Sequence, residues 1–330
     1  MRSERFRGFI PGFVLGVVLV AGCKPEPHRP DAAPPWWKPA PGQAADWDIQ
    51  LARTPFDISA PRAMYTIDLW DAVPAATSMD YGDGAPVEVP AGAHAGAIAD
   101  LHGRALPAIV VCHVGTGAIR LTDPDAKKFP GYEASPPNRP TPIAAGSVIG
   151  WSITSADSNE RWIDLHDASR SKVLPLIQKR LELALAIGCD AIAANRNDLL
   201  GFQGTAETHG FTDVTPGEYA SWTTDLTGRA HDLRISIGLR ATVNQVVDAT
   251  PPNTYDWLMT DRCVEGGFEC DVAQPFINAR KAVFAIEYTV DTNGDTNNPT
   301  LLCADLKKKG IADGIVKDGA LSSAAYERCP

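Results

Sequence analysis

The segment Gly188-Cys189-Asp190-Ala191-Ile192-Ala193-Ala194-Asn195-Arg196-Asn197-Asp198 reads as a short buried strand that runs directly into a turn crowded with polar side chains. In barrels built from alternating strands and helices, the functional residues lie at the carboxyl ends of the strands. A buried strand that finishes in Asn, Arg, Asn and Asp therefore predicts a pocket at its end.

Short apolar or β-branched runs alternate with helical patterns along the rest of the chain, which indicates repeated βα units and a parallel sheet. The predicted strands are Trp47–Leu51, Met64–Leu69, Ala108–Val114, Trp162–Leu165, Ala191–Ala194, Ile235–Leu239, Trp257–Met259, Val283–Tyr288 and Gly314–Val316. The clearest helix is predicted at Ser169–Ile187, where apolar residues recur at helical spacing. The pattern predicts the α/β class and a single (β/α)8 TIM barrel.

Two stretches rich in Pro, Gly, Ala and Asp, residues 71–93 and 123–147, are predicted to be loop insertions on the rim of this barrel. A doubly wound open sheet is the alternative fold, but no GxGxxG phosphate loop follows the first predicted strand. The sequence therefore favours the barrel.

Arginines precede an apolar run from Phe9 to Val20, which is too short to span a bilayer but suits a secretory signal. The run ends in Val20-Ala21-Gly22-Cys23, which resembles the lipobox of bacterial lipoproteins. We expect residues 1–22 to be a lipoprotein signal peptide and Cys23 to carry the lipid. An ordinary N-terminal membrane anchor is the alternative.

Residues 23–45 are rich in proline and lack apolar periodicity, so they predict an extended tether ahead of a barrel over residues 46–330. Lys24 follows the cysteine where an aspartate would be expected for retention at the inner membrane. By analogy with lipoprotein sorting, this favours the outer membrane or the cell surface of a bacterial envelope. We expect a monomer that meets the membrane only through its lipid anchor.

The formal net charge of the chain is −10 at pH 7, and no basic stripe with interleaved aromatic residues is present. A nucleic-acid partner is therefore not expected. An acidic surface is compatible with a cationic amino-sugar polymer, although acidity commonly serves solubility alone.

Six cysteines follow Cys23, in a compartment that permits disulfides. The candidate disulfides are Cys263 with Cys270 and Cys303 with Cys329. Cys112 and Cys189 lie within apolar runs and are expected to be buried thiols. The sequence lacks the CxxC or HxxxH spacing of a zinc site, so neither a metal nor another cofactor is expected.

Five predicted strands deliver acidic side chains to what would be one rim of the barrel. These side chains are Asp68, Asp71, Asp164, Asp198, Asp261 and Glu287. Paired carboxylates suit glycoside hydrolysis, in which one protonates the leaving oxygen while the other attacks the anomeric carbon or activates water. Any one of them could equally cap a turn, so the signal is their concentration at one rim. Trp70, Trp151, Trp162 and Tyr288 could stack on sugar rings there, with core packing as the alternative.

Several motifs together resemble those of glycoside hydrolase family 114, the endo-α-1,4-polygalactosaminidases. They are Trp36-Trp37-Lys38-Pro39, Trp47–Leu51, Tyr65-Thr66-Ile67-Asp68, Gly188-Cys189-Asp190, Asp261-Arg262-Cys263 with Glu269-Cys270, and Lys281–Tyr288. The resemblance runs from about Trp36 to the C-terminus and implies a (β/α)8 barrel that acts on a galactosamine-type polysaccharide.

The catalytic motif departs from the family pattern, in which the opening segment runs Gly-Cys-Asp-Gly-Val-Glu-Pro-Asp-Asn-Val-Asp. The family Glu falls on Ala193, the presumed nucleophile on Asn195, and the following Asn on Arg196. The family's second Glu falls on Asp261, and its Lys-Asn pair falls on Arg240 and Ala241. An amide is a poor nucleophile, so a retaining reaction through Asn195 is not expected.

Two routes to hydrolysis stay open. Asp198 could act in place of Asn195, or Asp261 as general acid could work with Glu287 or Asp164 in an inverting reaction. The residues expected to bind substrate are Asp68, Trp70, Trp151, Asp164, Asn195, Arg196, Arg240 and Tyr288. We therefore expect an envelope-tethered glycosidase that cleaves a galactosamine-type polysaccharide. The alternative is an inactive barrel that binds glycan at the cell envelope.

Overall fold

The computed structural model describes residues 36–44, 46–139, 142–153, 159–197, 199–202, 209–242, 251–265 and 270–330. The predicted signal peptide, Cys23 and most of the predicted tether lie outside these residues, as does Asp198. Within the described part of the chain, no helix is both long enough and apolar enough to cross a membrane.

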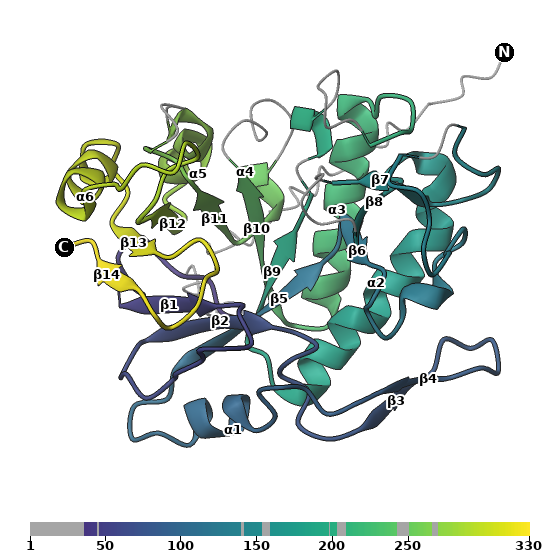
Figure 1. Cartoon of the computed structure of the whole chain (residues 1–330), viewed down its shortest axis with the longest axis horizontal. Coiled ribbons are helices and arrows are strands. Elements are labelled where there is room, and N and C mark those ends of the chain that lie inside the picture. The colour runs from purple at the N-terminus through teal and green to yellow at the C-terminus, as the bar shows by residue number, and fades with distance from the viewer. Residues whose placement is uncertain are drawn as a thin grey trace, which may run out of the picture. The chain divides into compact units, whose positions relative to one another are not determined.

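A nine-stranded sheet forms the body of the molecule (Figure 1). Its strands, in spatial order, are β1 (Trp47–Gln50), β2 (Met64–Asp68), β5 (Ile109–Gly115), β9 (Ala191–Asn195), β10 (Ser236–Thr242), β11 (Trp257–Asp261), β12 (Val283–Tyr288), β13 (Asp313–Lys317) and β14 (Tyr326–Arg328). Neighbouring strands pair in parallel from β1 to β13, and β14 pairs with β13 in the antiparallel sense. The predicted TIM barrel is confirmed in a nearly closed form.

Side chains rather than backbone pairing join the two ends of the parallel sheet. Lys317 Nζ on β13 lies 2.7 Å from Asp48 Oδ1 on β1, and both side chains are buried. The indole Nε1 of Trp47 donates to the carbonyl of Asp313 at 3.2 Å. These contacts hold β1 and β13 beside each other, as Figure 1 shows.

Helices occupy most of the connections between the barrel strands. They are α1 (Ala97–His102), α2 (Asp167–Ile187), α3 (Pro216–Asp232), α4 (Pro251–Thr254), α5 (Gln274–Asn278) and α6 (Pro299–Lys308). The connection from β1 to β2, residues 51–63, contains no helix. Single 3-10 turns lie at Ala126–Lys128, Leu199–Phe202 and Cys270–Ala273.

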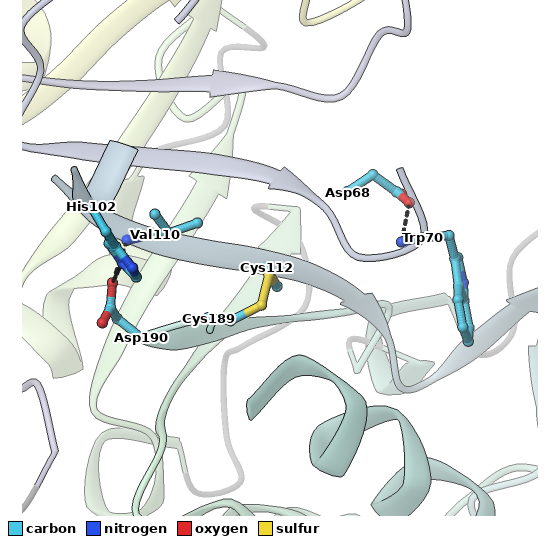
Figure 2. Close-up of a disulfide and its surroundings, with 7 residues drawn as sticks. All are labelled: Asp68, Trp70, His102, Val110, Cys112, Cys189 and Asp190. Atoms are coloured by element: carbon cyan, nitrogen blue, oxygen red, sulfur yellow. Dashed lines mark hydrogen bonds and ion pairs between the residues drawn. A yellow bond between two sulfur atoms is a disulfide. The ribbon is translucent and has the colours of Figure 1, made fainter. Parts of the chain in front are cut away.

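The Gly188-Cys189-Asp190 motif joins α2 to β9 and fixes β9 against β5. Gly188 has φ 98°, a left-handed conformation that glycine adopts without steric cost, and it ends α2. Cys189 forms a disulfide with Cys112 of β5 (Figure 2). Asp190 Oδ2 accepts the amide N–H of Val110 at 2.8 Å. All three residues of the motif are therefore structural.

The disulfide between Cys112 and Cys189 corrects the expectation of two buried thiols. It forms because β5 and β9 are neighbours, which brings the two Cα atoms to 5.8 Å. The predicted pairs Cys263–Cys270 and Cys303–Cys329 are confirmed. Three disulfides indicate that the protein folds outside the cytoplasm.

Two small sheets lie outside the barrel. One is the hairpin of β3 (Thr77–Met79) and β4 (Val87–Val89), within the predicted insertion 71–93. The other joins β6 (Ala118–Arg120), β8 (Glu160–Ile163) and β7 (Ile149–Ser152) in that order, and its strands flank the predicted insertion 123–147 instead of lying in it. The predicted strand Trp162–Leu165 corresponds to β8, so its assignment to the barrel was wrong. Its side chains are apolar because this sheet buries Trp162 and Ile163.

Alternation along the strands divides the core into two layers. One apolar cluster fills the barrel interior and includes Trp47, Met64, Val111, Ala193, Met259 and Ile286. The alternate residues, among them Ile67, Cys112, Ile192, Leu239, Leu258 and Ala285, pack in a second cluster with the helices. Two residues further along four of these strands, the next inward-facing side chains lie at the carboxyl end of the barrel. They are His113, Asn195, Asp261 and Tyr288.

Two tryptophans close the opposite, amino end of the barrel. Trp36 stacks on His231 with ring centroids 4.3 Å apart and donates from Nε1 to Asp256 at 3.3 Å. Trp37 packs against Trp257 and Phe284, at the beginnings of β11 and β12. The described chain therefore enters the barrel from its amino end.

Candidate active site

A cavity of about 310 Å³ opens at the carboxyl ends of the barrel strands, and we call it the rim cavity. Its lining residues are Leu51, His113, Arg120, Glu160, Asn195, Arg196, Arg240, Ala241, Asp261, Arg262 and Tyr288. Most of them are the last residues of their strands or follow directly. Strand β9 thus ends in this cavity, through Asn195 and Arg196.

A larger cavity of about 790 Å³ adjoins the first, and we call it the outer cavity. It is lined in part by Asp68, Trp70, Arg120 and Asp123. The same four residues also line a narrow space that reaches His113, Glu160 and Asn195 of the rim cavity. Leu51 and Arg120 line both the rim cavity and the outer cavity, so the two cavities are neighbours at this end of the barrel.

Asp261 is held at the floor of the rim cavity by two neighbours. Arg240 donates to both of its oxygens, from Nε at 3.2 Å and from Nη2 at 3.2 Å. The hydroxyl of Tyr288 donates to Oδ1 at 2.5 Å. Burial opposes the charge of this carboxylate, but Arg240 and these hydrogen bonds hold the pKa of Asp261 below its ordinary value. Asp261 is therefore ionised near neutrality, which argues against its expected role as a general acid.

Asn195 and Arg196 face a carboxylate that comes from the insertion sheet. Glu160 Oε2 lies 3.2 Å from Arg196 Nη2, and Glu160 Oε1 lies 3.5 Å from Asn195 Nδ2. Arg196 has φ 61°, a left-handed conformation that is uncommon for a residue with a side chain. Among the described residues, the carboxylate that contacts the expected nucleophile position is therefore Glu160, which the sequence did not identify.

His113 lies between the two cavities with both ring nitrogens unbonded. It is 4% exposed, and its Nδ1 lies 3.7 Å from Asp68 Oδ2, beyond hydrogen-bond range. Burial lowers the pKa of His113, so the ring is neutral at physiological pH. A neutral imidazole has one donor and one acceptor nitrogen, which suits a sugar hydroxyl.

Asp68 and Trp70 line the outer cavity and the narrow space beside it. Asp68 accepts from Arg120 Nη1 at 3.1 Å and from the amide of Trp70 at 3.0 Å. Although burial favours the neutral acid, the polar ring of His113, 3.7 Å away, and the cation of Arg120 lower the pKa of Asp68 to about 2. Asp68 is a fixed anion that orients Arg120, and Trp70 offers an aromatic surface beside it.

Asp123 lies behind Arg120, deep in the wall of the outer cavity. Its carboxylate pairs with the buried Arg180 at 3.1 Å and accepts the amide of Arg120 at 3.2 Å. Burial raises the pKa of Asp123 to about 6, against the attraction of Arg180. These contacts anchor the strand that carries Arg120.

Three predicted site residues lie apart from the cavities. Glu287 is buried on the outward face of β12, where it accepts the amides of Val264 and Glu265 at 2.8 and 3.1 Å. Burial raises the pKa of Glu287 to about 7. Side chains alternate between the two faces of a strand. Because Tyr288 points into the barrel, Glu287 just before it points outward.

Asp164 and Trp151 belong to the insertion sheet and its continuation. Asp164 accepts from Ser169 Oγ and His166 Nδ1, each at 2.5 Å, and so supports the start of α2. Trp151 lies on β7, where Arg139 stands 5.7 Å from its ring. Asp164, Trp151 and Glu287 line neither cavity. In the described parts of the chain, no group of three or more His, Cys, Asp or Glu side chains is placed to hold a metal ion.

Comparisons with known proteins identify a family for the chain and structures of similar fold. A model of the glycoside-hydrolase family GH114 matches residues 26–330. The structure of Ega3 from Aspergillus fumigatus in complex with galactosamine is similar, with a TM-score of 0.61 and 24% identity over 89% of this chain and 97% of that one. The glycoside hydrolase domain of PgaB (BpsB) from Bordetella bronchiseptica aligns with a TM-score of 0.47 and 12% identity, over 86% of this chain and 95% of that one. None of the curated proteins compared with the chain matches it.

Proposed function

The chain belongs to glycoside hydrolase family GH114, and from that premise we propose that it binds a galactosamine-type polysaccharide in the rim and outer cavities without cleaving it by the family's covalent route. The observation that carries the proposal is the pair of groups at the expected catalytic positions. One is the amide of Asn195, and the other is a carboxylate clamped by Arg240. Both groups can hold a sugar, and neither suits the bond-breaking role.

The covalent route needs an anionic nucleophile and a nearby proton donor. The amide of Asn195 is uncharged and its nitrogen points to Glu160 at 3.5 Å. Asp261 is ionised and has no proton to give to a leaving oxygen. What these groups retain is hydrogen-bonding capacity, which together with Trp70 and His113 suits the capture of a glycan.

Hydrolysis by an inverting reaction is a second candidate, because Glu160 and Asp261 line the same cavity. In that reaction Asp261, held ionised, activates a water, and Glu160 delivers the proton to the leaving oxygen. Asp198 is the other carboxylate that the sequence offers for either role. This candidate requires both carboxylates and no covalent intermediate.

One experiment separates binding from cleavage. The full chain is incubated with α-1,4-linked polygalactosamine and with its N-acetylated form, and both co-sedimentation with polymer and release of reducing ends are measured. Saturable binding with no reducing ends after prolonged incubation supports the primary proposal. Release of reducing ends that disappears in both Glu160→Gln and Asp261→Asn supports the second. Absence of binding and of cleavage rejects both.

The proposed location is the outer membrane or cell surface of a bacterium, with the lipid on Cys23 and residues 24–45 as a tether. The three disulfides support a site outside the cytoplasm. Metabolic incorporation of a labelled fatty acid that Cys23→Ser abolishes would support the anchor. Unchanged labelling in that variant rejects it. Light scattering of the purified chain tests the proposed monomer.

A further inference from the structure

The rim cavity presents more positive than negative side chains to a ligand. Its lining contains four arginines, Arg120, Arg196, Arg240 and Arg262, and two carboxylates, Glu160 and Asp261. His113 adds no charge, because burial keeps it neutral. The overall chain carries a net charge of −10, so this local excess of arginine runs against the composition of the protein.

Each of the four arginines has a carboxylate partner, and three of the four pairs expose the arginine more than the carboxylate. Arg120 is paired with Asp68, Arg196 with Glu160 and Arg262 with Glu265. The three arginine side chains are 40%, 23% and 32% exposed, whereas their partners are 5%, 14% and 1% exposed. In the fourth pair, Arg240 and Asp261 are 12% and 10% exposed. A ligand in this cavity therefore meets more guanidinium than carboxylate surface.

The orientation of these guanidinium groups is fixed before a ligand arrives. Arg120 is held by Asp68, which stays ionised. Arg262 is held by Glu265, and its guanidinium carbon lies 4.2 Å from the ring centroid of Tyr288. A guanidinium with fixed geometry binds a planar carboxylate through two parallel hydrogen bonds. The same groups repel an ammonium group such as the free amine of galactosamine.

The His113 side chain independently indicates that a polar ligand binds in the rim cavity. Its two ring nitrogens are buried without hydrogen-bond partners among the described residues, and the side chain lines the wall shared by the rim cavity and the narrow space beside it. A buried polar group without a partner is costly in free energy. A sugar hydroxyl would satisfy it.

We propose that the sugar residue bound in the rim cavity is acidic, and that the carboxylate of a uronic acid contacts Arg120 and Arg262 while a ring hydroxyl contacts His113. The inference rests on the proposed function, in which this cavity binds glycan, and it specifies the chemical class. Within a galactosamine-type polymer, it selects a form that carries uronic acid residues over one built from free amines alone.

The test uses three ligands that share linkage and ring configuration and differ in charge. They are α-1,4-linked trigalacturonic acid, trigalactose and trigalactosamine, and their affinities for the full wild-type chain are measured by calorimetry at low and at moderate salt. A charge-assisted contact predicts that the galacturonic trimer binds at least about 10-fold more tightly than the neutral trimer. Salt should reduce this advantage.

Two substitutions assign the effect to the cavity. Arg120→Gln should remove most of the advantage of the acidic trimer over the neutral one, while Arg120→Lys, which keeps the charge, should retain part of it. The matched control is Arg328→Gln, which removes an exposed arginine from β14, outside both cavities. Thermal unfolding of each variant verifies that it is folded.

The possible results distinguish failure of the acidic-ligand proposal from failure of glycan binding itself. Equal or tighter binding of the neutral or the amino trimer overturns the acidic class and leaves glycan binding in place. Binding of none of the three trimers rejects both. Because the ligand series is measured on the wild-type chain, a variant that fails to fold does not remove the test.

Discussion

The guanidinium of Arg240 spans both carboxylate oxygens of Asp261, with Nε 3.2 Å from Oδ2 and Nη2 3.2 Å from Oδ1. The two side chains are only 12% and 10% exposed. Arg240→Leu would leave Asp261 buried without its cation, so we expect a loss of about 3 kcal/mol in the free energy of unfolding at pH 7. Urea denaturation measures this loss.

The same pair permits a double-mutant cycle. Arg240→Leu combined with Asp261→Leu removes both charges, and most of the lost stability should return. If the two single effects simply add in the double variant, the two side chains are not coupled as described.

Restoring the two expected catalytic carboxylates should restore cleavage of the glycan. Asn195→Asp with Asp261→Glu supplies an anion at the nucleophile position and lengthens the second side chain by one methylene. We expect release of reducing ends from N-acetylated polygalactosamine at least about 10-fold above the wild-type level. The matched control is Asn195→Ser with Asp261→Glu, which lacks the nucleophile and should stay inactive. Equal rates in both double variants would show that Asn195 is not at the reacting position.

Acid should weaken the fold through Asp68. Its pKa is lowered to about 2 in the folded protein, against about 3.9 in an unfolded chain. The difference contributes stability above pH 4, about 2.5 kcal/mol, and this contribution is lost as the pH falls from about 4 to about 2. Asp68→Asn should therefore be less stable than the wild type at pH 7 and approach it near pH 2. Asp100→Asn, an exposed change on α1, should show no such convergence in denaturant unfolding.

The disulfides should differ in their contribution to stability. Cys112 and Cys189 are 77 residues apart, whereas Cys263 and Cys270 are 7 apart. Chain entropy alone predicts a loss of about 4 kcal/mol on removing the first and about 2 kcal/mol on removing the second. Paired Cys→Ser variants measured by thermal unfolding check the order. A larger loss at Cys263–Cys270 would contradict it.

Trp70 should matter for long ligands more than for short ones. It lies in the outer cavity, next to the rim cavity. We expect Trp70→Ala to weaken a hexasaccharide of α-1,4-galacturonic acid about 10-fold, the scale of one lost stacking contact, and a disaccharide much less. Trp151→Ala is the control, because Trp151 lines neither cavity. Equal losses for both variants would place the polymer elsewhere.

The barrel could be predicted because its strands are buried on both faces and recur with helices between them. The sequence pattern could not tell β8 from a barrel strand, since Trp162 and Ile163 are as buried in the insertion sheet as in a barrel. The error had a further effect. Placing β8 between β5 and β9 would separate Cys112 from Cys189, whereas their strands are in fact neighbours joined by a disulfide.

The candidate site could be predicted in part, for similar physical reasons. Asn195, Asp261 and Tyr288 converge because each ends a parallel strand on its inward face, and Arg240 joins them from near the end of β10. The outward direction of Glu287 was not readable, because both faces of β12 are apolar and alternation leaves no mark in the sequence. Glu160 comes from an insertion whose placement depends on tertiary packing, so nothing local to Asn159-Glu160-Arg161 indicates that it reaches Asn195.

The tryptophans at the amino end of the barrel bear on how the molecule would be displayed. Trp36 is fixed to Asp256 and Trp37 to Trp257, at the end away from both cavities. Under the proposed lipid anchor, the tether would join the barrel at this closed end. A polymer would then reach both cavities without passing the point where the tether joins the barrel.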